Sequence, residues 1–154
     1  MAAIGTFPTI RNVLYSGNNI HQFTATAAVK AGQVVSFAAT GVSGAVNKAV
    51  SGTTGQPIGV ALYDAAAGAK VAVACSGCVV YVANEDDTTG IDTGDVLMCG
   101  TNAVGGTVVL ATLTNAGAVA LKVYVCGIAI DDIAGAGTGR MLVKCDYMLA
   151  PNTA

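Results

Sequence analysis

The chain has 154 residues, a formal net charge of −2 and only 10% charged residues. This length allows one domain, or two fused half-domains, with a core that needs neither disulfides nor metals. Its seven Lys and Arg residues form no cluster, which argues against nucleic acid as a partner. Glycine and asparagine interrupt the longest uncharged run, between Asp95 and Lys122, so no membrane span is expected.

Residues 1–27 predict an extended N-terminal arm with a short strand over residues 12–15. No helical period is visible there, and turn-forming residues separate the apolar ones. Residues 1–5 lack the basic region of a secretory signal, so synthesis in the cytoplasm is expected. Large apolar side chains in an arm of this kind are candidates for contact with a partner: Phe7, Ile10, Leu14, Tyr15 and Phe23.

Residues 28–149 predict one β domain, followed by a tail over residues 150–154. Short runs rich in Val, Ile and Thr alternate with turn residues, as in a sandwich or barrel. No segment has the period of a long helix. The expected strands are residues 33–39, 47–50, 57–62, 70–75, 79–82, 95–99, 107–113, 119–130 and 140–145.

The strongest internal signal is a duplication, with half-repeats over about residues 29–82 and 91–146. The offset between the copies is 68 residues from Gly59 to Gly127 and 70 from Val73 to Val143, which predicts a two-residue insertion in the second turn. Two such halves are expected to close into one small barrel, which would remove exposed sheet edges. The residues assigned to structural turns are Gly59, Asp64, Gly68, Gly127, Asp132 and Gly137.

One loop concentrates acidic residues, with five of the nine acids of the chain inside eleven positions. Oxygen-rich loops can bind calcium, but the spacing is not that of an EF-hand, and a solvated loop is the main interpretation. The weak candidates for a metal site are Glu85, Asp86, Asp87, Asp92 and Asp95.

Other motifs with catalytic or cofactor chemistry are incomplete. Cys75 and Cys78 have zinc or redox spacing, but a structural zinc site needs a second pair and a redox motif begins a helix. The odd number of cysteines favours reduced thiols. A strand, not a helix, follows the glycine-rich residues 135–140, and His21 is the only histidine. We therefore expect neither an enzyme nor a cofactor.

The ordered motifs from residue 29 to residue 146 resemble the phage capsid-cement, or head-decoration, proteins, small all-β proteins formerly described as recombinase-like. The resemblance rests on residues 59–61, 64–68, 76–79, 93–97, 127–130 and 137–143. It implies a homotrimer on the outer surface of an icosahedral capsid, in contact with the major capsid protein. It also implies that the protein stabilises the shell and catalyses no reaction.

Two alternatives stay open from the sequence. One is a small-ligand or calcium-binding barrel that uses the loop of residues 85–95, and the other is a structural protein of a tail or fibre. For the capsid hypothesis, the arm supplies the adhesive contacts. A chain without residues 1–24 is then expected to keep a folded core but to lose the shell.

Overall fold

The computed structural model describes residues 4–10, 14–38, 43–50, 56–101, 103–111 and 122–149. Within these ranges the regular structure is entirely β, which confirms the predicted all-β class. The described residues contain no helix with the length and apolar character needed to cross a bilayer. The strands are β1 (Leu14–Ser16), β2 (Ile20–Ala25), β3 (Val34–Phe37), β4 (Ala45–Lys48), β5 (Pro57–Ala61), β6 (Lys70–Ala74), β7 (Val79–Ala83), β8 (Val96–Cys99), β9 (Val108–Leu110), β10 (Lys122–Ala129) and β11 (Thr138–Leu149).

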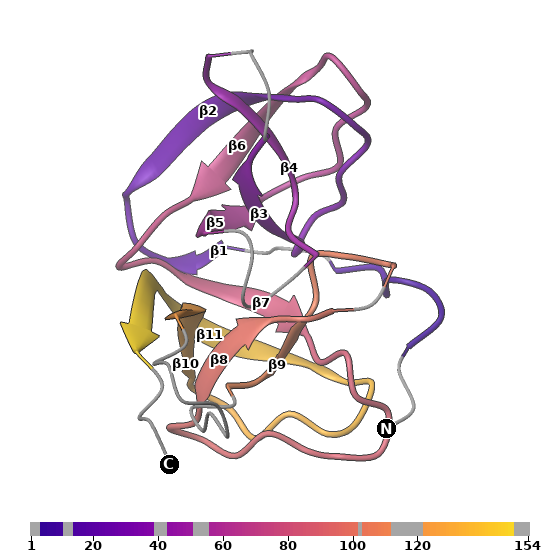
Figure 1. Ribbon diagram of the computed structural model, residues 1–154, viewed down its shortest axis with the longest axis vertical. Coiled ribbons are helices and arrows are strands. Elements are labelled where there is room, and N and C mark those ends of the chain that lie inside the picture. Colours follow the sequence, from indigo (N-terminus) through magenta and orange to yellow (C-terminus); the bar gives the residue numbers. More distant parts are fainter. Residues whose placement is uncertain are drawn as a thin grey trace.

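The first half of the chain closes on itself as a five-stranded barrel in the order β2-β4-β3-β5-β6 (Figure 1). Closure comes from a parallel pairing of β2 with β4 at Thr24–Ala45 and Ala25–Val46. Because barrel diameter falls with strand number, a five-stranded barrel has room only for small side chains. The interior supplies them: it is built mainly of Ala and Val.

The second half forms a sheet in the order β1-β7-β11-β10-β8-β9. Without the edge strand β1, this order matches that of the first half when the strands are followed around the ring in the opposite direction. Strands β7, β8, β9, β10 and β11 then take the places of β2, β3, β4, β5 and β6. An isolated parallel bridge between Asn84 and Val108 joins the end of β7 to β9. It is the equivalent of the Ala25–Val46 pair, which closes the first barrel. The two halves therefore stack as separate units (Figure 1). The prediction that they close into one shared barrel is wrong.

Backbone hydrogen bonds repeat between the halves. The reciprocal bonds of Val29 with Ala65 recur in Ile91 and Ile133. The bond from the Gly32 amide to the Ala61 carbonyl oxygen, 2.8 Å, recurs from Gly94 to Ala129 at the same length. The duplication seen in the sequence is thus a duplication of the fold.

The predicted two-residue insertion is wrong. Ala61 pairs with Val73 in the first half, and Ala129 pairs with Met141 in the second. The offset therefore stays at 68 residues through both strands of the hairpin. The alignment of the two copies by sequence matches Val73 with Val143 and not with Met141. Apolar strands of similar composition align almost equally well when one copy is shifted by two residues.

Gly59 and Gly127 hold equivalent places where two strands approach closely. A Cβ atom on Gly59 would overlap the carbonyl oxygen of Ala74, and one on Gly127 would overlap that of Leu142. Both backbones lie outside the left-handed region. Their requirement for glycine is therefore one of space.

The N-terminal boundary differs from the predicted arm of residues 1–27. Ile20–Ala25 is strand β2, and it pairs with β6 from Ile20–Ala74 to Thr24–Lys70. Leu14–Ser16 pairs with β7 at the edge of the second half. Of the predicted arm, residues 4–10 lie outside any strand. Residues 12–13 of the expected arm strand, parts of the expected strands (39, 112–113 and 119–121) and the tail (150–154) lie outside the described residues.

Candidate interaction surface

Two predicted contact residues, Phe7 and Ile10, are buried in the chain's own core. Ile10 lies directly against Gly32 of the first barrel. The Ile4 amide also donates to the Glu85 carbonyl oxygen, at 2.8 Å, in the second half. The segment of residues 4–10 thus contacts both halves, and the hydrophobic effect that was expected to hold a partner fixes it to its own chain.

The other three predicted contact residues differ in their surroundings. Tyr15 is 61% exposed, and the Arg140 guanidinium lies 4.7 Å from the centre of its ring. Phe23 is half-buried and makes an edge-to-face contact with Phe37, with ring centroids 5.9 Å apart. The side chain of Leu14 lies outside the described residues. The structure therefore does not bring the five together as one patch.

Arg140 is held by Asp131 in a two-oxygen arrangement typical of strong charge-assisted pairs. Its Nε donates to both carboxylate oxygens, at 3.1 and 2.9 Å, and its Nη2 donates to Oδ1 at 2.6 Å. The Arg140 amide donates to Oδ2 at 3.0 Å. These hydrogen bonds lower the pKa of Asp131 to about 2. The pair orients the cation that lies over Tyr15.

The pairing predicts an acid-sensitive contribution to stability. The folded pKa of Asp131 is about 2, below its ordinary value, so the stabilisation is complete above about pH 4 and is lost as pH falls through 2. Asp131→Asn should lower the urea midpoint modestly at pH 7, and the difference from wild type should shrink toward zero near pH 2. Asp87→Asn, at an exposed position, is the control. A difference independent of pH would contradict the assignment.

The predicted turn residues fix the connections within each half. Asp64 Oδ1 accepts from the Ala31 amide at 2.9 Å, and Asp132 Oδ1 accepts from the Thr93 amide at 2.8 Å. Gly68 has φ of +82°, and Ala136, at the equivalent place, has φ of +54°. Gly137 follows that turn. Both aspartates therefore tie a turn to the preceding segment of their own half.

The acidic loop uses its carboxylates internally. Asp86 Oδ1 accepts from the Thr88 and Thr89 amides at 2.9 and 3.1 Å, and these bonds lower the pKa of Asp86 to about 2. Glu85 is buried and accepts from the Thr107 hydroxyl at 2.8 Å.

Asp95 accepts from the Asp92 amide at 2.9 Å, and Asp87 is exposed. In the described ranges, no group of three or more His, Cys, Asp or Glu side chains could hold a metal ion. A pocket lies beside the loop. Its volume of about 230 Å³ is small for a ligand site. The described residues of this loop thus offer no observation in favour of the ligand-binding alternative.

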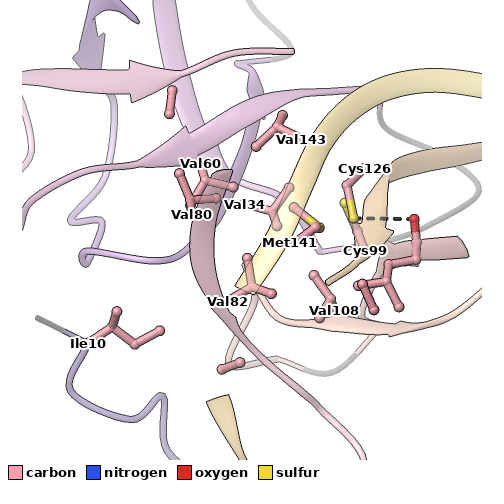
Figure 2. Close-up of a cluster of buried hydrophobic side chains, with 14 of the residues drawn as sticks. Ile10, Val34, Val60, Val80, Val82, Cys99, Val108, Cys126, Met141 and Val143 are labelled. Atoms are coloured by element: carbon pink, nitrogen blue, oxygen red, sulfur yellow. Dashed lines mark hydrogen bonds between the residues drawn. The ribbon is translucent and has the colours of Figure 1, made fainter. Parts of the chain in front are cut away.

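The five cysteines are free, and three of them are buried. Burial raises the pKa of the Cys75 and Cys145 thiols. The Cys126 thiol donates to the Leu97 carbonyl oxygen at 3.4 Å within the core, beside Cys99 (Figure 2). A thiolate is the form that binds metals or reacts in redox exchange, and these surroundings oppose it.

A feature that the sequence reasoning missed lies on the outer face of the second half. Val96, Ile128 and Leu142, from three adjacent strands, are only partly buried there. Beside them runs a groove of about 240 Å³, lined by Val96, Val125, Gly127, Ile128, Lys144, Asp146 and Met148. The alternation of β11 and its place in the duplication are the signals that could have found this face.

Comparison with known proteins adds a structural likeness. No family model and no curated protein matches the chain. Among solved structures, the N base of head fiber gp8.5 in bacteriophage phi29 is similar, with a TM-score of 0.56 and 19% sequence identity. The match covers 81% of this chain and 92% of that one. At this identity it shows a shared fold.

Proposed function

We propose that this chain is a structural protein of a phage virion, made in the host cytoplasm, that decorates the outside of an icosahedral head. Its partners would be the major capsid protein and further copies of itself, as a homotrimer. The observation that carries the proposal is the likeness to the base of a phage head fiber over 81% of the chain. The motifs between residues 29 and 146 resemble head-decoration proteins independently of that likeness.

The proposed mechanism is adhesion between capsid subunits, without a reaction. Burial of apolar surface contributes about 25 cal/mol per Å², less the cost of association. The described surface offers suitable side chains and few charges. Its large exposed hydrophobic residues are Tyr15, Ile20, Phe37, Val50, Tyr63, Leu110, Tyr147 and Met148. Among the arm residues considered from sequence, we assign Tyr15 to the shell, because its side chain is the most exposed of those that the structure describes.

The test uses empty shells assembled from the major capsid protein encoded in the same genome. Purified full-length chain should sediment with these shells to a saturating copy number and should raise the temperature at which they rupture. A chain that stays in the supernatant at every ratio would contradict the proposal.

Tyr15→Ala and Tyr63→Ala form a matched pair for the assignment of the contact. Both rings are exposed, at 61% and 44%, but they belong to different halves. Loss of a central interface tyrosine typically costs about tenfold in affinity or more. We expect such a loss for Tyr15→Ala alone. Equal effects of the two variants would remove Tyr15 from the contact.

A fibre base is the second candidate, and the similar phi29 structure favours it because it is the base of a head fiber. Assembly separates the two functions. A decoration protein forms compact units on the shell, whereas a fibre base carries an elongated assembly that continues outward.

A further inference from the structure

The interior of the first barrel reaches solvent at one end. Its buried side chains form a separate cluster, against which Phe23 packs while only partly buried. Phe37 continues from Phe23 toward solvent with 58% of its surface exposed. We call Phe23 and Phe37 the barrel end. Two adjoining aromatic rings in this position form an apolar surface that the described residues of the chain cover only in part.

The equivalent end of the second half is covered. In the first half, Phe23 pairs with Val71 and Phe37 pairs with Val46. At the equivalent places of the second half, Val82 pairs with Gly139 and Cys99 pairs with Val108. Val82 and Cys99 therefore hold the places of the two aromatic residues. Both are fully buried, in the cluster that continues into the first half (Figure 2).

The cover is the outer face of the first barrel. Val34, Val60 and Ala74 are fully buried in the same cluster as Val82 and Cys99. Backbone bonds fix this contact: the Val34 amide donates to the Gly106 carbonyl oxygen at 2.8 Å, and the Gly106 amide donates to the Ala49 carbonyl oxygen at 2.6 Å. Within one chain, the end of one half thus packs against the outer face of the other.

The same outer face exists on the second half, where the described residues leave it partly exposed. Val34 pairs with Val60, and Val60 pairs with Ala74; Val96 pairs with Ile128, and Ile128 pairs with Leu142. Val96, Ile128 and Leu142, which we call the outer face, are therefore the equivalents of the three buried residues. All three are apolar and partly exposed, and the groove that contains Met148 adjoins them.

We propose that the barrel end of one copy docks on the outer face of a second copy, head to tail. This contact would repeat between chains the packing that already joins the two halves within each chain. Each half would then have its end covered and its outer face used. The proposal goes beyond the proposed function, which names copies of the chain as partners but not the surfaces that meet, and its test requires no shell.

An interface between two different surfaces is heterologous. It forms a closed ring if the rotation from copy to copy closes, and an open series otherwise. Each chain offers one barrel end and one outer face, so blocking either surface stops growth after one contact. This property gives the test its specificity.

The experiment measures mass by sedimentation velocity for the full chain and two variants, Phe37→Asp and Ile128→Asp. Wild type should form multimers and each variant alone should be monomeric. An equimolar mixture of the variants should form a one-to-one heterodimer, because each supplies the surface that the other has lost. A wild type that stays monomeric, or a mixture that does not associate, would overturn the proposal.

Controls separate a lost contact from a lost fold. Each variant should keep the circular dichroism spectrum and cooperative melting of wild type. If the partly buried Ile128→Asp does not fold, Met148→Asp, at a 40% exposed position in the same groove, takes its place. Tyr63→Asp, also exposed, lies outside both surfaces and should leave the multimer unchanged. Equal dissociation by Tyr63→Asp would contradict the assigned surfaces.

Discussion

A chain that lacks residues 1–24 is expected not to fold. The deletion removes most of β2, which pairs with β6 at five positions and closes the barrel through β4. It also removes Phe7 and Ile10 from the core. Native domains are stable by only about 5–15 kcal/mol, and the loss of a barrel strand and two buried side chains exceeds that margin. This expectation replaces the one drawn from sequence, that a folded core remains.

Circular dichroism and cooperative thermal melting test the deletion. The control is a chain without residues 1–6, which retains Phe7, Ile10 and both N-terminal strands. It should melt cooperatively, at a temperature close to that of wild type. If the chain without residues 1–24 also melts cooperatively, β2 is dispensable and the closed barrel is not the unit of stability.

Gly59→Ala and Gly127→Ala each add only one methyl group. For so small a change, we expect them to cause the largest losses of stability. In each case the added methyl group would overlap a carbonyl oxygen of the neighbouring strand, from Ala74 or Leu142. Backbone atoms cannot rotate away as a flexible side chain can, so the paired strands must separate. We expect a loss of about 3 kcal/mol or more in the free energy of unfolding at each position.

Gly5→Ala is the matched control for these substitutions. A Cβ atom on Gly5 would meet no atom within 4 Å, and its backbone is outside the left-handed region. Urea denaturation should show a change close to zero for this variant. A loss of less than about 1 kcal/mol at both Gly59 and Gly127 would show that the strands can move apart, against the packing described here.

The fold class and most strands could be predicted because alternating Val and Ala between glycine-rich turns is specific for short strands. Strand β2 was missed because it contributes to an open barrel end. His21, Gln22 and Thr24 give it a polar composition, and Phe23 is only half-buried. Its strand character comes from β6, which lies about fifty residues further along the chain, and local composition does not carry that information.

The residue-by-residue alignment of the two halves could not be predicted from the sequence either, and two core positions show why. The first half places Ala65 and Val71 where the second half places Ile133 and Gly139, and Ile133 fills the space at Gly139. Such exchanges conserve volume across the core but hide the correspondence between the sequences. The prediction for Phe7 and Ile10 went wrong for a related reason: an apolar side chain in an arm predicts burial, but not whether its own chain or a partner supplies the cover.

The central claim is that this duplicated fold serves as contact surface on a phage head. Electron microscopy of shells with and without the purified chain tests it most directly. We predict added density on the outside of the shell, at fixed symmetry positions, into which two stacked β units fit. Shells that look identical in the two preparations, under conditions where the chain is folded and in excess, would contradict the claim.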